Sequence, residues 1–148
     1  MNLSSFGRLI DRQIAGGTDA IIVCGTTGEA ATMTQSERAE VIACCVDRVA
    51  GRVPVIAGTG ANDTRVACGN ALAAERLGAD GLLIVTPYYN KATQQGLLRH
   101  YKAIADSVTT PIILYNVPSR TGVNILPETY AELARHPNVV GVKEACGD

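Results

Sequence analysis

The chain has 148 residues, the length of one ordinary domain, and 47% of them are hydrophobic while 18% are charged. This composition is typical of a folded globular protein and excludes a disordered or fibrous one. The formal net charge is −1 and no run of basic residues occurs, which argues against binding to nucleic acid or to an anionic membrane surface.

Helical and strand-like segments alternate along the chain. Apolar residues at helical spacing predict helices, Thr34 followed by Glu37 predicts a helix N-terminus, and short continuous apolar runs predict buried parallel strands. In chain order, we expect a helix over 2–15, a strand over 20–24, a helix over 34–50, a strand over 53–57, a helix over 63–77, a strand over 81–85, a helix over 93–107, a strand over 112–115, a helix over 127–135 and a strand over 139–142.

Strict alternation of this kind indicates five parallel strands joined by right-handed crossovers. Two α/β architectures fit that pattern: a doubly wound sheet of five strands, or part of a (β/α)8 barrel, which needs about 250 residues in all. Segments that enter strands are short turns, whereas segments that leave strands carry the chemically active side chains. A barrel surrounds its site with the loops at the carboxyl ends of all its strands, so we favour the barrel.

Two side chains at these carboxyl ends could carry covalent or proton-transfer chemistry. Lys143 follows the apolar run 139–142, and an amine at the end of a buried strand is partly desolvated, which lowers its pKa and frees it to attack a carbonyl. Tyr115 ends its own apolar strand and could pass protons to a substrate. Each residue also has a plainer interpretation: the lysine reaches water and the tyrosine packs.

Other residues near the strand ends could bind anions. Gly25, Thr26 and Thr27 form a turn whose hydroxyls and backbone amides can approach an anion, although the pattern alone is a weak signal. Arg120 could bind a carboxylate through two hydrogen bonds or could simply be solvated.

The cysteines and the apolar runs give no sign of a metal site or a membrane segment. None of the five cysteines forms a C-x-x-C pair, and neither histidine stands near a cysteine at metal-ligand spacing. We therefore expect no metal site, and we expect the cysteines to be core residues in a reducing compartment. No targeting segment and no apolar run near the ~20 residues of a membrane span is visible, so we expect a cytoplasmic protein.

Four motifs together resemble the dihydrodipicolinate synthase family of pyruvate-dependent class I aldolases, which includes N-acetylneuraminate lyase. The resemblance covers the whole chain, and the third motif is the most specific. The motifs are Gly25-Thr26-Thr27-Gly28-Glu29, Pro87-Tyr88-Tyr89-Asn90, Tyr115-Asn116-Val117-Pro118-Ser119-Arg120-Thr121-Gly122 and Val142-Lys143-Glu144.

The resemblance implies a (β/α)8 barrel of which residues 1–148 supply about strands 2–6 with their helices. It implies a lyase that condenses pyruvate with aspartate-4-semialdehyde through a Schiff base, giving 4-hydroxy-tetrahydrodipicolinate for lysine biosynthesis by way of diaminopimelate. No metal and no organic cofactor is expected. The expected partners are the two substrates and further copies of the chain, in a homodimer or a homotetramer, without nucleic acid or membrane.

The resemblance also assigns roles to particular residues. Lys143 matches the lysine that forms an imine with pyruvate. Tyr115 matches a tyrosine that shuttles protons, and it is linked through the hydroxyl of Thr26 to a tyrosine from a neighbouring subunit, which Tyr89 matches.

The substrate-binding roles fall on the anion-binding candidates. Thr27 matches a residue that helps to hold the pyruvate carboxylate, and we expect Gly25 to contribute to the same subsite. Arg120 matches an arginine at the entrance that binds the carboxylate of the second substrate.

Members of the family are about twice as long as this chain. We therefore expect the first strand, the last two strands and a C-terminal helical domain to be absent from residues 1–148, and these residues alone to be inactive. Three alternatives remain at this point: a lyase for a sialic acid or a sugar-derived 2-keto acid, which Arg120 and the paired threonines argue against; an inactive truncated fragment; and a non-catalytic, five-stranded binding module. Strand order would distinguish the last from a barrel.

Overall fold

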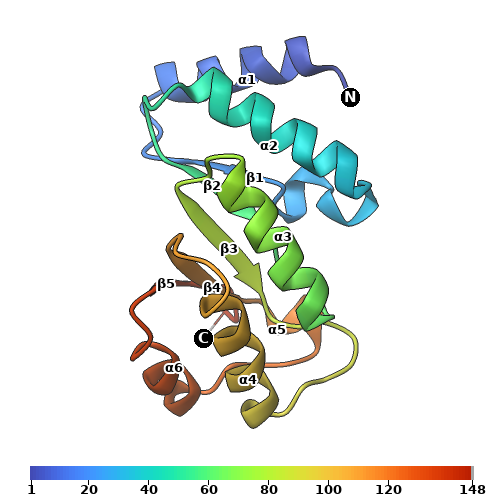
Figure 1. Ribbon diagram of the computed structural model, residues 1–148, viewed down its shortest axis with the longest axis vertical. Coiled ribbons are helices and arrows are strands. Elements are labelled where there is room, and N and C mark those ends of the chain that lie inside the picture. Colours follow the sequence, from blue (N-terminus) through green and yellow to red (C-terminus); the bar gives the residue numbers. More distant parts are fainter. Residues whose placement is uncertain (148) are drawn as a thin grey trace.

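The computed structural model describes residues 1–147 and consists of one parallel sheet with a layer of helices beside it (Figure 1). The strands are β1 (Ile21–Val23), β2 (Val55–Gly58), β3 (Gly81–Val85), β4 (Ile112–Asn116) and β5 (Val139–Glu144). The α-helices are α1 (Leu3–Ala15), α2 (Gln35–Val49), α3 (Thr64–Arg76), α4 (Gln94–Ala105), α5 (Pro118–Thr121) and α6 (Pro127–Leu133), and two 3-10 turns are η1 (Thr26–Gly28) and η2 (Ala30–Thr32).

The order of the strands decides between the two architectures that the sequence allows. The strands lie in the order β1-β2-β3-β4-β5, and every neighbouring pair is parallel. A doubly wound sheet of five strands has the order 2-1-3-4-5, so that alternative is wrong. Sequential order is the arrangement of a (β/α)8 barrel, and the prediction of a partial barrel is confirmed.

The two faces of the sheet have different surroundings. Ala57, Leu82 and Leu114 point to one face and belong to the main hydrophobic core, which they share with residues of the helices. Leu83 and Tyr115 point to the other face and form a small separate cluster that contains no residue of a long helix. The helices therefore cover one face only, and the uncovered face corresponds to the interior of a barrel.

The sequence predicts the long elements closely, with boundaries that agree within two residues. The helix start at Thr34 is also confirmed: its hydroxyl accepts a hydrogen bond from Glu37 N at 3.2 Å, and its own backbone N donates to Glu37 Oε2 at 2.8 Å. The sequence analysis missed η1, η2 and α5, because three- or four-residue helices are too short to show a helical period.

Residues 139–142 belong to a strand, as expected, but the expectation that this strand is buried is wrong. Val140 is 61% exposed and Val142 is 47% exposed. A parallel strand is buried when neighbours cover both of its edges and both faces. Within residues 1–147, β5 pairs with β4 alone and forms an edge of the sheet, so its apolar side chains stay in contact with solvent.

At the opposite edge, β1 and β2 come unusually close where they end. Cys24, directly after β1, has a left-handed backbone with φ of 55°. A Cβ atom added at Gly58, the last residue of β2, would lie 2.1 Å from the Cys24 carbonyl oxygen. Glycine is therefore required at this position because the chain of the neighbouring strand occupies the space of a side chain.

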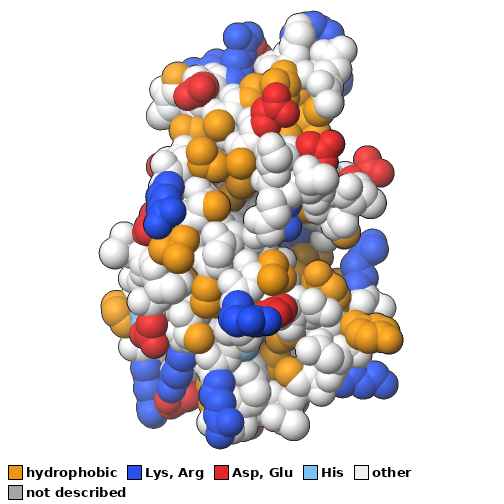
Figure 2. Space-filling view, turned by 45° about the vertical axis from the view of Figure 1, so that its right-hand side comes forward, with side chains coloured by type: hydrophobic (Ala, Val, Ile, Leu, Met, Phe, Trp, Pro, Cys, Tyr) orange, Lys and Arg blue, Asp and Glu red, His pale blue; other side chains and the backbone are white. Residues whose placement is uncertain are grey.

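On the face shown in Figure 2, Lys and Arg side chains are interspersed with Asp and Glu, and hydrophobic side chains lie between them. None of the helices within residues 1–147 is long and apolar enough to cross a membrane.

One histidine is buried between α3 and α4. The ring of His100 on α4 lies with Nδ1 2.9 Å from the hydroxyl of Thr64 at the start of α3, and its buried Nε2 has no hydrogen-bond partner among the described residues. Burial lowers the pKa of His100 to about 4, from an ordinary value of 6.5. The folded state therefore resists protonation of this ring.

We predict that His100 makes the protein sensitive to mild acid. Between the two pKa values the unfolded chain binds a proton on His100 and the folded chain does not. The contribution of the neutral His100 ring to the unfolding free energy is therefore complete above pH 6.5 and is lost as the pH falls towards 4. From pH 7 to pH 5, the unfolding free energy should fall by about 2 kcal/mol more in the wild type than in His100→Gln. Urea unfolding at pH 7 and pH 5 measures the unfolding free energy of each protein. An equal fall in the wild type and in His100→Gln would contradict the prediction.

We also predict opposite effects of alanine at two glycines. Gly58→Ala forces the ends of β1 and β2 apart and should lower the unfolding free energy by about 1–3 kcal/mol. Gly69 provides the matched control, because it lies within α3 and a Cβ added there would meet no atom within 4 Å. Gly69→Ala should therefore raise the unfolding free energy by about 0.5–1 kcal/mol. Urea unfolding of both variants tests the pair, and an unchanged Gly58→Ala would refute the close approach.

Candidate active site

A cavity of about 280 Å³ opens on the uncovered face of the sheet, at the carboxyl ends of the strands. Its wall combines the ends of β1 to β4, the segments that follow them and one side chain from α2. The lining residues are Cys24, Gly25, Thr26, Ala30, Ala31, Arg38, Gly58, Gly60, Leu83, Val85, Tyr88, Tyr115, Val117, Arg120 and Thr121.

The charged groups of this lining are all of one sign. Arg38 and Arg120 are its two charged side chains, and it contains no Asp or Glu. The hydroxyls of Thr26 and Tyr115 add hydrogen-bond donors. A cavity with this lining favours an anionic ligand, and guanidinium groups in particular suit carboxylates.

The segment after β1 is held in place by its backbone. Gly25 is the extended residue before η1, and the N–H of Gly28 donates to its carbonyl at 3.0 Å. The turn brings Gly25 and Thr26 into the cavity wall, as the sequence analysis expects. Thr27 is exposed and is not among the lining residues, so the fold does not bring it to the cavity.

Tyr115 is positioned by the sheet. It is the fourth residue of β4, is only 8% exposed, and packs with Leu83 and Val117 on the uncovered face. Parallel register places Val85 of β3 on one side of it and Lys143 of β5 on the other. Its ring therefore forms the floor of the site at the end of three neighbouring strands.

Lys143 lies directly against this tyrosine. Its Nζ is 4.3 Å from the centroid of the Tyr115 ring, within the range of a cation–π interaction. Among the described residues Lys143 forms no salt bridge, whereas Lys102 pairs with Glu132 at 2.8 Å. The model thus brings the two principal residues of the sequence prediction together.

The expected desolvation of Lys143 is not seen. The side chain is exposed, because β5 is the edge of the sheet and nothing within residues 1–147 covers that side. A pKa lowered by burial needs surrounding apolar groups, and the sequence analysis assumed them from an apolar run that is itself exposed.

Arg120 reaches the cavity from a short helix that the sequence did not predict. α5 begins with Pro118 at its first position, ends at Thr121 and is followed by Gly122, which caps it with a left-handed φ of 74°. Arg120 is exposed and lines the mouth of the cavity. This position suits a group that meets a carboxylate at the entrance.

Tyr89 is the one proposed catalytic residue that points away from the site. It is 88% exposed, has a positive φ of 76°, and does not line the cavity. Its neighbour Tyr88 lines the cavity instead. A large aromatic ring held this far into solvent suits contact with another chain, but within this chain it is not brought to Tyr115 or Thr26.

The sequence analysis missed Arg38. This residue of α2 donates from Nη2 to the Gly58 carbonyl at 2.7 Å and lies beside Cys24. Desolvation raises the pKa of the Cys24 thiol, and the nearby Arg38 only partly offsets this. No sequence signal marks Arg38, because an arginine on an amphipathic helix is most often a solvated side chain.

No metal-binding cluster of three or more His, Cys, Asp or Glu side chains occurs within residues 1–147. The five cysteines are free. The side chains that line the cavity carry a thiol, phenols, hydroxyls and guanidinium groups, and the amine of Lys143 lies beside it against Tyr115.

Comparison with known proteins identifies the family. The model of the dihydrodipicolinate synthetase family matches residues 1–148. The 4-hydroxy-tetrahydrodipicolinate synthase of Thermoanaerobacter sp. (strain X514) is 59% identical over 149 residues, which cover 100% of this chain and 50% of that protein. The chain thus spans about half the length of the curated relatives that it matches.

Solved structures agree with this result. The chloride-inhibited dihydrodipicolinate synthase of Acinetobacter baumannii, crystallised with pyruvate, is 51% identical with a TM-score of 0.99, covering 100% of this chain and 51% of that one. A variant reported as the first monomeric dihydrodipicolinate synthase is 49% identical with a TM-score of 0.97, covering 99% and 49% of the two chains. The chain belongs to the dihydrodipicolinate synthetase family.

Proposed function

We propose that this chain is the larger part of the active site of a lyase that condenses pyruvate with aspartate-4-semialdehyde to give 4-hydroxy-tetrahydrodipicolinate, a step of lysine biosynthesis. The observation that carries the proposal is the contact of Lys143 with Tyr115 beside a cavity whose charged groups are two arginines. A nucleophilic amine, a proton-transfer group and binding sites for carboxylates are the components that this reaction needs.

The first step uses Lys143 as the nucleophile. Its deprotonated amine attacks the keto carbon of pyruvate, water leaves, and an imine links the lysine to the substrate. The protonated imine accepts electrons from the adjacent methyl group, which loses a proton and becomes an enamine. The enamine carbon then attacks the aldehyde of the second substrate and forms the new carbon–carbon bond, and the aldehyde oxygen takes up a proton to become the hydroxyl group. The amino group of the second substrate finally attacks the imine carbon, which closes the ring and releases the Lys143 amine.

Proton transfer in these steps falls to Tyr115. Its side chain touches Lys143, so it can donate to the departing hydroxyl and accept the methyl proton with little movement. Thr26 lines the same cavity and is the candidate to relay protons onward. Tyr89, which points to solvent in its own chain, would complete the relay in a neighbouring subunit of a homodimer or homotetramer.

The arginine side chains and the hydrogen-bond donors of the cavity would bind the carboxylates of the substrates. Arg120 at the mouth is placed to bind the carboxylate of the semialdehyde through two hydrogen bonds. Gly25 in the wall, together with Thr27 next to the wall on the same turn, would hold the pyruvate carboxylate through backbone and hydroxyl donors. The reaction proceeds through the imine and requires no metal or organic cofactor in this scheme.

The curated relatives are twice as long as this chain, so we propose that further barrel strands and a C-terminal helical domain complete the enzyme. The tests below use an extended protein, in which the parts of the Thermoanaerobacter relative outside the matched 149 residues are joined to either end of this chain. Additional strands would cover the open edge at β5 and surround Lys143 with apolar groups, which supports its nucleophilic form.

We predict that pyruvate and borohydride add a stable mass to Lys143 in the extended protein, because reduction converts the imine into an amine that cannot hydrolyse. Lys143→Ala should abolish both the adduct and turnover. Lys102→Ala is the matched control, since that lysine of α4 is held in an ion pair with Glu132 of α6, and it should keep both. Peptide mass mapping locates the adduct; labelling at Lys91 or Lys102 in the wild type would refute the assignment.

We predict that Tyr89 acts across a subunit interface. Tyr89→Phe and Tyr115→Phe should each be inactive, and a mixture allowed to exchange subunits should recover activity. Random exchange in a two-fold symmetric dimer leaves one of two sites intact in half of the dimers, so recovery should approach about a quarter of the wild-type rate. No recovery, after mass spectrometry has demonstrated exchange, would show that Tyr89 does not serve a neighbouring site.

A further inference from the structure

The pairing of β4 with β5 contains one extra residue. Ile112 lies opposite Val139, but the next residue, Ile113, lies opposite Gly141. Val140 therefore has no partner, as in a β-bulge. This shift lies only three residues before Lys143.

The bulge decides which face of the sheet carries Lys143. Side chains alternate between the two faces of a strand, so a shift of one residue exchanges the faces of every residue that follows. With regular pairing from Val139 onward, Val142 would lie opposite Tyr115, and Lys143 would point towards the helices. With the bulge, Lys143 lies opposite Tyr115 on the uncovered face.

A polar cluster on the helix side holds this shifted pairing. Glu144 lies opposite Asn116 in the register, and Asn116 Nδ2 donates to the two carboxylate oxygens of Glu144 at 2.9 and 3.1 Å. Asn116 is 1% exposed. In the regular register these two residues would not be opposite one another, so the hydrogen bonds exist in the bulged form only.

The other donors of the cluster reach the same carboxylate, and one of them, the Ala145 N–H, is shared with the Asn116 carbonyl at 2.9 Å. Tyr130 of α6 donates its hydroxyl to Glu144 Oε2 at 2.7 Å, and the backbone N–H groups of Ala145 and Cys146 donate to Oε1 at 3.0 Å each. Desolvation raises the pKa of Glu144, but these donors outweigh it and lower the pKa overall. The group thus remains a carboxylate surrounded by donors.

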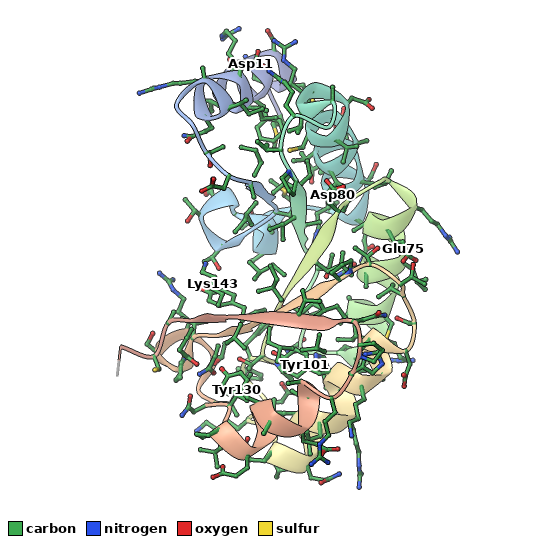
Figure 3. The ribbon with its side chains drawn as sticks, turned by 90° about the vertical axis from the view of Figure 1, so that its left-hand side faces the viewer. Asp11, Glu75, Asp80, Tyr101, Tyr130 and Lys143 are labelled. Atoms are coloured by element: carbon green, nitrogen blue, oxygen red, sulfur yellow. The ribbon has the colours of Figure 1, made fainter. Side chains whose placement is uncertain are left out.

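Figure 3 shows the consequence for the two faces of the strand: Lys143 lies on one side of β5, and Tyr130 of α6 lies on the other. Asn116 also ties the segment that carries Arg120. Its Nδ2 donates to Asn124 Oδ1 at 2.6 Å and its Oδ1 accepts from Ile125 N at 3.2 Å.

We propose that Glu144 and Asn116 are positioning residues that lock the bulged register of β5 and thereby hold Lys143 against Tyr115. Neither residue lines the cavity, so both act through Lys143. The catalytic consequence, that a nucleophile is held in place, rests on the proposed function. The structural consequence, that Lys143 lies against Tyr115, rests on the register alone.

The test compares Glu144→Gln with Glu75→Gln in the extended protein. All the partners of Glu144 donate to it, and an amide keeps one acceptor oxygen but presents N–H donors in place of the other, so the cluster loses one of its two acceptor atoms. Glu75 is the matched control: its Oε1 accepts four hydrogen bonds from Thr109 and Thr110 before β4, far from the site, and the charge change is the same.

The first readout does not involve pyruvate. Reductive ¹³C-dimethylation labels the lysine amines, and the Lys143 signal, assigned with Lys143→Arg, should be shifted upfield by the ring of Tyr115. Glu144→Gln should lose this shift, whereas Glu75→Gln should keep it. Persistence of the shift in Glu144→Gln overturns the proposal.

The second readout is the rate of adduct formation with pyruvate and borohydride. It should fall about 10–100-fold in Glu144→Gln, in line with the cost of misplacing a reacting group by about 1 Å, and stay unchanged in Glu75→Gln. An unchanged rate in Glu144→Gln also overturns the proposal. If the wild type shows the upfield shift but never forms the adduct, the proposed function is refuted. In that case, loss of the shift in Glu144→Gln still supports the positioning role.

Two further variants keep the test decisive if Glu144→Gln does not fold. Tyr130→Phe removes one donor and should reduce both readouts partially. The double variant Asn116→Asp with Glu144→Gln again places a donor opposite a carboxylate. If Glu144→Gln folds, the double variant should recover both readouts relative to it. If Glu144→Gln is unfolded, the double variant should recover the fold. Wild-type behaviour of Tyr130→Phe together with failure of the double variant would overturn the proposal.

Discussion

Side chains alternate between the two faces of a strand, so the single extra residue at Val140 determines whether Lys143 lies against Tyr115 on the uncovered face or points towards the helices. The neighbouring strands have no such freedom, because Leu83 and Tyr115 are fixed by regular pairing and by burial on the uncovered face. The amine joins their row only through the bulge. Everything proposed for the chemistry depends on that row, since Tyr115 can exchange protons with a substrate on Lys143 only if the two side chains meet.

The other constraints of the site are constraints of space and charge. Gly58 lets β2 end against the carbonyl of Cys24, which draws the turn with Gly25 and Thr26 into the cavity wall. Arg38 from α2 caps the Gly58 carbonyl from the other side. The result is a cavity with cationic groups and hydroxyls around an apolar floor, which suits small carboxylates.

The sequence predicts the order and type of the long elements because each contains several apolar residues at one period, and it predicts the carboxyl-end site because parallel strands must all end on the same side. Lys143, Tyr115, Thr26 and Arg120 are predicted in this way, and the structure places the last three in the cavity wall and Lys143 against Tyr115. The bulge could not be found: the run of 139–142 is apolar throughout, so it carries no alternation from which a face could be assigned. Glu144 and Asn116 were missed for a related reason, since their pairing exists only in the shifted register. The exposure of β5 was missed because an apolar run predicts burial without stating what covers it.

The central claim is that the register of β5, rather than any direct contact with substrate, is what Glu144 controls. Deleting Val140 from the Glu144→Gln variant of the extended protein tests it most directly. Without the extra residue, regular pairing from Val139 already places Lys143 opposite Tyr115, so the polar lock is no longer needed. The rate of pyruvate adduct formation on Lys143 should therefore recover towards the wild-type value. A rate that stays as low as in Glu144→Gln, in a protein that folds and pairs β5 with β4, would show that Glu144 acts in some way other than through the register.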